Sequence, residues 1–291
     1  MISYPNVKVN FGLEVLRKRP DGFHDIETLF VPYFGISDTL EIVAGEDYSK
    51  TSASLFARYG EDEVVQGISE DGKLMITIAR KGGVDWEPLE DLCAKAYHLL
   101  DVRYKLPPVK IFLEKTSPVG AGLGGGSSDA AFSLRMLAEM FGLDRGEEAL
   151  AGHAASLGSD CAFFIYNRPM SGEGRGEILS PFDLNDIDFG NCTGCGYELK
   201  VLVPENIKVS TSEAYKNIVP REAAGIACTS LKDLLNSPVE EWKRHIVNDF
   251  ETSVFAVHPE LKQLKESLYD SGAVYASMSG SGPALFAIYK K

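Results

Sequence analysis

A glycine-rich segment near the middle of the chain has the residue types of an anion-binding loop. It runs from Pro118 to Ser128, and Asp129 follows. Glycines let backbone N–H groups turn toward a ligand that no Cβ obstructs. A helix that begins here adds free N–H donors and about half a positive charge. The hydroxyls of Ser127 and Ser128 add further donors or a metal ligand. The segment therefore predicts a site for phosphate groups.

Neither of two widespread phosphate motifs fits these residues. No Gly-Lys-Ser/Thr follows the glycines, so the segment is not a Walker A motif. Gly122 and Gly124 lack the third glycine of a dinucleotide fingerprint, because Ser127 stands in its place, and no early first strand precedes them. A flexible linker and a plain glycine-rich entry into a helix remain as alternatives.

The segments on either side of the loop have the patterns of regular elements. A strand is predicted at 109–114, and a helix is predicted after the loop because apolar residues recur at helical spacing. Ser127 or Ser128 is the expected N-cap of that helix. Its expected buried stripe comprises Ala130, Leu134, Leu137 and Phe141.

The first residues alternate between apolar and polar types. The apolar ones are Val7, Val9, Phe11, Leu13 and Val15. This period of two predicts a half-buried strand. Lys8 and Asn10 then project from one face, opposite the core.

Strands and helices intermix along the chain without a strict alternation, which indicates the α+β class. Further strands are predicted at 26–45 (with a turn at Ser37–Asp38), 161–166, 199–203 and 284–289. Helices are predicted at 91–104, 147–157, 212–217, 240–250 and 259–269. The acidic stretch 46–73 is interpreted as a hairpin region or as an insertion outside the regular elements.

A turn-rich stretch at 167–176 predicts two domains, at 1–166 and 167–291. The length of 291 residues is also that of about two domains.

Composition excludes several classes of protein. The 29 Lys and Arg residues against 42 Asp and Glu give a net charge of −13, which disfavours a general nucleic-acid binder because phosphate contacts need clustered basic residues. No run approaches the ~18 apolar residues of a membrane span, and the first residues show no leader pattern. Five cysteines without framework spacing favour a reducing compartment, so we expect a cytoplasmic protein.

Cys192 and Cys195 have redox or zinc spacing, but without a second Cys or His pair they are interpreted as a surface turn.

Three segments together resemble the GHMP kinases, the family of galactokinase and of homoserine, mevalonate and phosphomevalonate kinases. They are Val7–Leu13, Pro118–Ala131 and Met278–Phe286, in this order across nearly the whole chain. The resemblance implies an amino-terminal domain like the second domain of ribosomal protein S5 and a ferredoxin-like carboxy-terminal domain. It also implies ATP as the phosphoryl donor, Mg²⁺ as the metal and a small molecule as the acceptor.

The segment Arg19–Phe30 indicates which class of acceptor to expect. It is similar to the Arg-Pro-Asp-Gly-Tyr-His signature of the branch of the family that phosphorylates the 2-hydroxyl of a cytidyl diphosphate sugar alcohol in the non-mevalonate route to isoprenoids. Leu157–Phe164 also resembles that branch, although Ser159–Ala162 lacks the proline that usually follows the aspartate, and Asn6–Asn10 replaces the usual Pro-Ala-Lys-Ile-Asn. The alternatives are another GHMP kinase, of the homoserine or phosphomevalonate type, and a catalytically silent nucleotide-binding protein on this fold.

The resemblance also implies roles for individual residues. Asp160 is the expected catalytic base, which orients the alcohol and accepts its proton late in a loose transition state. Lys8 is expected beside it, where it keeps the carboxylate ionised and offsets charge on the transferred phosphoryl group. The residues expected to hold the ATP phosphates are Pro118, Val119, Gly120, Ala121, Gly122, Leu123, Gly124, Gly125, Gly126, Ser127 and Ser128, of which one of the two serines reaches Mg²⁺. The residues expected to bind the acceptor are Asn10, Phe23, His24, Thr211 and Tyr215, with the cytosine ring between Phe23 and Tyr215.

Overall fold

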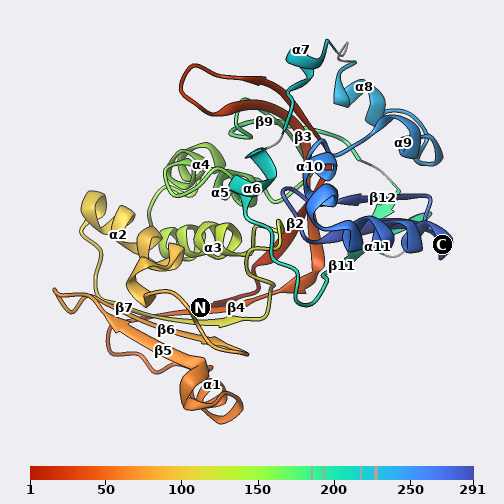
Figure 1. The fold of residues 1–291 in the computed structure, drawn as a ribbon. Helices are drawn as coiled ribbons and strands as arrows, with labels where there is room; N and C mark the ends of the chain where they lie inside the picture. Colours follow the sequence, from red (N-terminus) through yellow and green to blue (C-terminus); the bar gives the residue numbers. More distant parts are fainter. Residues whose placement is uncertain (185, 193, 217, 226–228) are drawn as a thin grey trace. The chain divides into compact units, whose positions relative to one another are not determined.

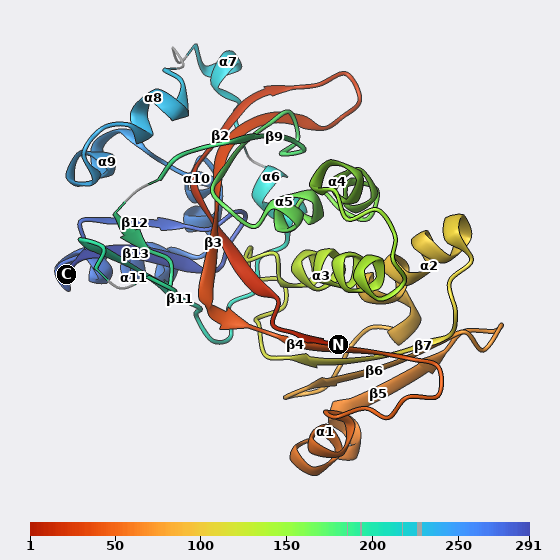
Figure 2. The same ribbon diagram turned by 180° about the vertical axis from the view of Figure 1, so that it is seen from behind.

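Residues 1–291 except 185, 193, 217 and 226–228 are described by a computed structural model (Figures 1 and 2). Their contacts divide the chain into two units. The first comprises Met1–Val7, Ile36–Val119 and Gly125–Tyr166, and the second comprises Lys8–Gly35, Gly120–Gly124 and Asn167–Lys291. This grouping differs from a single division after residue 166, because the strand that carries Lys8 and the middle of the glycine-rich segment belong with the carboxy-terminal residues.

The first unit is built on a five-stranded sheet of order β1-β4-β7-β6-β5. Its strands are β1 (Ile2–Ser3), β4 (Thr39–Ala44), β5 (Val64–Ile68), β6 (Leu74–Arg80) and β7 (Val109–Lys115). Only β6 and β7 run parallel within this sheet, as far as the described residues show. A parallel pair needs a crossover connection, and α2 (Leu92–Tyr104) supplies it. The strand predicted at 109–114 and the helix predicted at 91–104 are confirmed, and the Asp91 side chain caps α2 by accepting from the Cys93 N–H.

Helices lie on both faces of this sheet. They are α1 (Ser52–Arg58), α2, α3 (Gly125–Met140), α4 (Glu147–Ala155) and α5 (Cys161–Tyr166), with 3₁₀ turns η1 (Glu61–Glu63) and η2 (Pro88–Glu90). Figure 1 shows α2 and α3 on one face and α1 on the other. Leu55 of α1 packs against Val43, Ala79 and Phe112 of the sheet. The acidic stretch 46–73 thus contributes a helix that the sequence did not predict, and its strand β5 forms a hairpin with β6.

The second unit contains two four-stranded sheets, of order β2-β3-β8-β9 and β10-β11-β13-β12. The strands are β2 (Asn6–Lys18), β3 (His24–Ser37), β8 (Met170–Glu173), β9 (Ile178–Pro181), β10 (Ile187–Asp188), β11 (Tyr197–Leu202), β12 (Tyr275–Met278) and β13 (Leu285–Lys290). The helices are α6 (Thr211–Lys216), α7 (Arg221–Ala224), α8 (Leu231–Leu235), α9 (Val239–His245), α10 (Phe250–Val257) and α11 (Pro259–Asp270). The predicted strands at 199–203 and 284–289 and the helix at 259–269 are confirmed within a residue or two. Of the helix predicted at 212–217, residue 217 lies outside the described residues.

The two faces of the carboxy-terminal sheet pack against different partners. On one face, Tyr275 contacts Phe11 of β2 and Trp242 of α9. The rings of Phe11 and Phe286 stack with centroids 5.0 Å apart, and Phe11 also contacts Trp242. On the other face, Met278 and Leu285 join a core with residues of α10 and α11. The first strand is therefore held in place by residues about 230 to 275 positions later in the chain.

The amino-terminal strand is buried on both faces, and the prediction of a half-buried strand is wrong in this respect. Lys8 and Asn10 do share a face, but each is less than 5% exposed. Glu14 is fully buried as well. The polar face does not meet solvent because the glycine-rich segment and β3 pack against it, as the hydrogen bonds described below show.

The strand predicted at 161–166 is a helix, α5. A six-residue apolar run is too short for its periodicity to distinguish a strand from a helix. The run packs against α3 and α4 rather than beside another strand. Asp160 consequently lies directly before a helix.

The helix predicted at 240–250 is interrupted, since α9 ends at His245 and α10 begins at Phe250. The intervening residues pair with β2: the Leu13 N–H donates to the Val247 carbonyl, and the Asp249 N–H donates to the Leu13 carbonyl. The Asn248 side chain donates to the carbonyls of Met278 and Gly280, each at 2.8 Å. Tertiary hydrogen bonds thus replace the helical ones that the local pattern favours.

Two further expectations concern the surface and membranes. Cys192 and Cys195, interpreted as part of a surface turn, are joined by a disulfide bond in the loop between β10 and β11, so their thiols are not free to hold a metal. No helix among the residues that the structure describes has the length and apolar character needed to cross a membrane.

Candidate functional site

The glycine-rich segment links β7 to α3, and its glycines take conformations that other residues avoid. Gly120, Gly122 and Gly124 have φ values of +71°, +77° and +70°. A Cβ at Gly122 would lie 2.3 Å from the Ser279 carbonyl oxygen. The helix α3 already begins at Gly125, so the prediction that Ser127 or Ser128 caps it is wrong: both serines lie inside its first turn. Their position still places them beside the free N–H groups of the helix start.

Lys8 contacts the glycine-rich segment directly. Its ammonium group donates to Asn10 Oδ1 at 2.7 Å and to the Gly122 carbonyl at 3.1 Å. Asn10 Nδ2 in turn donates to Thr28 Oγ1 on β3 at 3.1 Å. Ser279 Oγ donates to the same Gly122 carbonyl at 3.1 Å. The second unit therefore brings together parts of all three segments that carried the family resemblance.

Asp160 lies in the first unit, next to the start of α3. A Cβ at Gly158 would meet Cys161 Sγ at 3.3 Å and Ser127 Oγ at 3.9 Å, so the segment around Asp160 passes beside Ser127. Burial raises the pKa of the Cys161 thiol to about 11, and the Ser127 hydroxyl offsets this in part. The thiol is therefore an inert packing group. Lys8 and Asp160 belong to different units, and their pairing stays a prediction.

The aromatic residues expected to bind a base contact other side chains of the protein. The His24 ring stacks on Tyr215, with centroids 4.8 Å apart and planes inclined by 19°. Phe23 is 55% exposed and lies under the Arg175 guanidinium. Burial, with a contribution from Lys18, lowers the pKa of His24, so its imidazole is neutral near pH 7. Thr211 is hydrogen-bonded to Ser281 at 3.1 Å.

His24 and Tyr215 line a pocket of about 480 Å³ that also contains three basic side chains. The lining residues are Arg17, Lys18, His24, Tyr215, Lys216, Ile218, Pro220, Glu222 and Ala223. Sequence reasoning missed the basic residues because no motif links Arg17 and Lys18 to Lys216, which lies about 200 positions later in the chain. Aromatic and basic groups together suit a ligand with a flat ring and phosphate groups.

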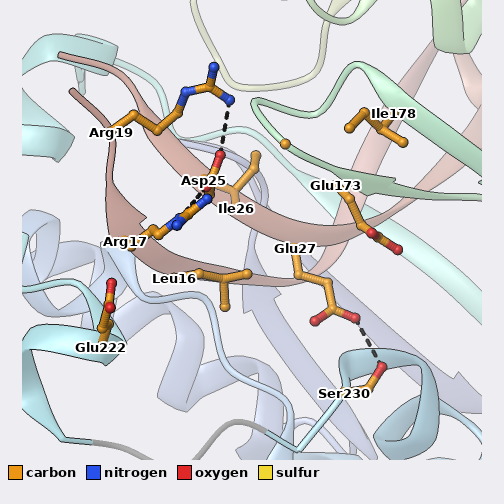
Figure 3. A pocket seen from close by; sticks show the side chains of 11 residues that line it. Leu16, Arg17, Arg19, Asp25, Ile26, Glu27, Glu173, Ile178, Glu222 and Ser230 are labelled. Carbon is orange, nitrogen blue, oxygen red and sulfur yellow. Dashed lines mark hydrogen bonds and ion pairs between the residues drawn. The ribbon is translucent and has the colours of Figure 1, made fainter. Parts of the chain in front are cut away.

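A larger pocket, of about 940 Å³, lies in the same unit (Figure 3). Its charged lining residues are Arg17, Arg19, Asp25, Glu27, Glu173 and Glu222. Both arginines are already paired with Asp25, and Glu27 accepts from Ser230, as Figure 3 shows. Carboxylates outnumber the cations here, so this pocket is the poorer host for a phosphorylated ligand.

A buried acidic side chain lies farther along β2. Glu14 pairs with the Arg221 guanidinium at 2.7 Å, and Arg221 also pairs with Asp249. Burial raises the pKa of Glu14 to about 7, although Arg221 opposes the shift.

For a metal, the residues that the structure describes include no group of three or more His, Cys, Asp or Glu side chains arranged as ligands. Ser128 Oγ is buried and has no hydrogen-bond partner. An unsatisfied hydroxyl in the first turn of α3 is compatible with Mg²⁺, because that ion keeps most of its ligands as waters and substrate phosphates.

Comparison with known proteins identifies relatives of both halves of the chain. Residues 91–168 match the model of the GHMP kinases N terminal domain, and residues 230–291 match that of the GHMP kinases C terminal domain. A 4-diphosphocytidyl-2-C-methyl-D-erythritol kinase from Azobacteroides pseudotrichonymphae is 42% identical over 295 residues, covering 100% of this chain and 94% of that protein.

Solved structures of GHMP kinases resemble this chain as well. A crystal structure of 4-(cytidine 5'-diphospho)-2C-methyl-D-erythritol kinase superposes with a TM-score of 0.72 at 27% identity, covering 99% of this chain and 89% of the other. A homoserine kinase from Cytophaga hutchinsonii has a TM-score of 0.55 at 16% identity, covering 99% and 86%, and shares the fold alone.

The two glycines that open α3 give a matched pair of variants. A Cβ at Gly125 would lie 2.3 Å from Ser117 Oγ and 3.1 Å from Lys115 Nζ, whereas a Cβ at Gly126 meets nothing closer than 3.8 Å. We expect Gly125→Ala to lower the free energy of unfolding by about 1–3 kcal/mol, because it overpacks a buried site. Gly126→Ala should change it by less than about 0.5 kcal/mol. Urea denaturation followed by circular dichroism checks both, and equal effects would contradict the packing argument.

The Glu14 carboxyl predicts a pH dependence of stability. Its pKa of about 7 in the folded state exceeds the ordinary value of 4.5, so the fold favours the protonated form. The resulting stability is complete below about pH 4.5 and is lost as the pH rises through 7. Glu14→Gln removes this titration, so its stability relative to the wild type should rise by about 1–3 kcal/mol between pH 5 and pH 8. Thermal melts across that range measure it, with the exposed Glu266→Gln as the control that shows no such trend.

Proposed function

Because the chain belongs to the GHMP kinase family, we propose that it transfers the γ-phosphoryl group of ATP to the 2-hydroxyl of 4-diphosphocytidyl-2-C-methyl-D-erythritol. The observation that carries the proposal is the 42% identity, over the full chain, to a kinase named for that substrate. GHMP kinases use ATP as co-substrate, so the reaction class follows from the family and the acceptor follows from the relatives. The product would feed isoprenoid synthesis by the non-mevalonate route, and the use of ATP suits an enzyme of the cytoplasm.

The ATP phosphates are proposed to lie on Pro118–Ser128. Supporting this, the segment has three glycines at positive φ and ends in the first turn of a sixteen-residue helix. Backbone N–H groups at such a helix start point toward an anion, and the helix dipole favours negative charge there. Ser127 and Ser128 would contribute the protein's contact to Mg²⁺, which supplies neutralisation of the charge that develops on the phosphates.

Asp160 is proposed to orient the acceptor hydroxyl and to accept its proton as the new O–P bond forms. In a loose transition state the proton leaves late, so an ordinary carboxylate is sufficient. Lys8 would offset charge on the transferred phosphoryl group. Its hydrogen bonds to Asn10 and to the Gly122 carbonyl support this role, because they aim the ammonium group at the segment proposed to hold the phosphates.

The cytidine diphosphate portion is proposed to enter the 480 Å³ pocket. Lys18 and Lys216 carry charge that a diphosphate needs, whereas Arg17 of the same pocket is already paired with Asp25. The neutral His24 can both donate to and accept from the edge of a pyrimidine. Tyr215 would have to exchange its stacking contact with His24 for one with the base, whereas Phe23 would cover the other side. Asn10 and Thr211 would bind hydroxyl groups of the acceptor.

Two alternatives remain to be tested. Another GHMP kinase activity would use the same ATP loop with a smaller acceptor, such as homoserine or phosphomevalonate, and would leave the basic pocket without a role. A catalytically silent nucleotide-binding protein would bind ATP without transfer. The presence of both Lys8 and Asp160 favours catalysis.

The first experiment measures ADP release from ATP and Mg²⁺ with 4-diphosphocytidyl-2-C-methyl-D-erythritol, beside homoserine, mevalonate, phosphomevalonate and a reaction without acceptor. We expect turnover with the cytidyl substrate alone. Asp160→Asn should lower kcat by about 10²–10⁴-fold, because it removes the proton acceptor. The exposed Asp183→Asn is the matched control and should retain full activity. Turnover with a different acceptor, or ATP binding without turnover, would move the assignment to one of the two alternatives.

A second pair of variants distinguishes the two pockets. Lys216→Met removes one cation from the smaller pocket and should raise KM for the cytidyl substrate by about tenfold, which is the loss of one charge-assisted hydrogen bond. KM for ATP should stay unchanged. Ile178→Ala alters the larger pocket of Figure 3 and should leave both KM values unchanged. The reverse outcome would assign the substrate to the larger pocket.

A further inference from the structure

Lys115, at the end of β7, is buried between two carboxylates. Its ammonium group donates to Asp129 Oδ2 at 2.7 Å, to Ser117 Oγ at 2.9 Å and to Asp38. Lys115 is 6% exposed, and Asp38 and Asp129 are each 1% exposed. All four residues belong to the first unit. None of them was singled out in the sequence as a functional group.

Asp38 extends this cluster to the start of the glycine-rich segment. Its Oδ1 accepts from the N–H groups of Thr116 and Ser117, each at 2.6 Å, and its Oδ2 accepts from Ser117 Oγ at 2.6 Å. Asp129 lies on α3, just past the far end of the segment. The Lys115 ammonium group is therefore hydrogen-bonded both to Ser117, which precedes Pro118, and to Asp129, which follows Ser128.

The charges within the cluster fit this arrangement. Burial opposes the charged ammonium, but the carboxylates of Asp129 and Asp38 raise the pKa of Lys115. Burial, with Asp38, raises the pKa of Asp129 well above its usual range. Lys115 thus stays protonated, and the Asp129 carboxyl takes up a proton more readily than an exposed one. The cluster therefore avoids an excess of buried negative charge.

Stability alone is a weak reason for such a cluster, because apolar residues of similar volume are often as stable as buried ion pairs. The segment that it encloses, however, contains five glycines between 120 and 126. Each glycine loses more conformational freedom on ordering than any other residue. A ligand that must order such a segment binds more weakly than one that meets it already ordered.

We infer that Lys115 is a positioning residue for nucleotide binding: by joining Asp38, Ser117 and Asp129 it fixes both ends of the glycine-rich segment in the geometry that receives the ATP phosphates. This inference rests on the proposed function, in which that segment holds ATP. Lys115 itself touches neither substrate. Its contribution is to hold the first turn of α3 and the entry to the loop in place before ATP arrives.

The test uses Lys115→Met, which keeps an unbranched side chain one atom shorter and removes the ammonium group. The matched control is Lys110→Met, on the same strand, whose ammonium group donates to the Asp47 carbonyl at 3.3 Å. Isothermal titration with ATP and Mg²⁺ gives the dissociation constant, and steady-state kinetics give KM for each substrate. We expect the ATP dissociation constant to rise at least tenfold in Lys115→Met, with KM for the acceptor changed less than twofold. Lys110→Met should bind ATP as the wild type does.

A purely structural role would lower the melting temperature of Lys115→Met but leave the ATP affinity of the folded protein unchanged, and that result would overturn the inference. If Lys115→Met does not fold, Ser117→Ala decides, since it removes one hydroxyl of the cluster and keeps the ion pairs. An ATP dissociation constant raised about threefold in Ser117→Ala supports the inference, and an unchanged one overturns it. Failure of the wild type to bind ATP would be a different result: it would overturn the proposed function, and the positioning role with it.

Discussion

The carbonyl oxygen of Gly122 accepts hydrogen bonds from Lys8 Nζ and Ser279 Oγ, and this single acceptor joins three segments that lie far apart in the sequence. The contact is possible only because residue 122 is a glycine at φ +77°, with no Cβ to strike the Ser279 carbonyl. The burial of Lys8, the direction of its ammonium group and the path of the glycine-rich segment all depend on this close approach. The chemistry proposed for Lys8 thus rests on a backbone conformation more than on any neighbouring side chain.

Local patterns in the sequence predicted the elements whose own residues determine them. The helix α2 has an aspartate cap and an apolar stripe, and β7 follows two prolines and has apolar residues at its centre. Tertiary contacts decided the elements that were predicted wrongly. The Cys161–Tyr166 run is helical because α3 and α4 surround it, and the expected helix at 240–250 breaks where Asn248 and its neighbours pair with β2. No window of ten residues contains that information.

In the candidate site, too, local motifs predicted some features and tertiary contacts decided the others. Motifs predicted the glycine-rich segment and the shared face of Lys8 and Asn10, because short spacings fix which residues are neighbours. They did not predict the basic lining of the 480 Å³ pocket, to which α6 and the end of β2 contribute side chains from distant parts of the chain. Phe23 and His24 illustrate the limit well. They were expected to serve one ligand together, and in the structure His24 stacks on Tyr215 while Phe23 lies under Arg175. Both contacts are with residues far along the chain, which a local motif does not specify.

The packing of Phe11 against Trp242, Tyr275 and Phe286 has a consequence for how the protein is made. A ribosome releases the first strand long before it has synthesised the last sixty residues, yet the hydrophobic surface that β2 needs is contributed mainly by those residues. Contacts of such long sequence separation form slowly, since a large loop must close first. During translation β2 can therefore pair with β3 while the face that carries Phe11 stays exposed, and exposed apolar surface of this kind is what chaperones recognise. The strand that carries Lys8 obtains its complete packing only when the carboxy-terminal strand has been made.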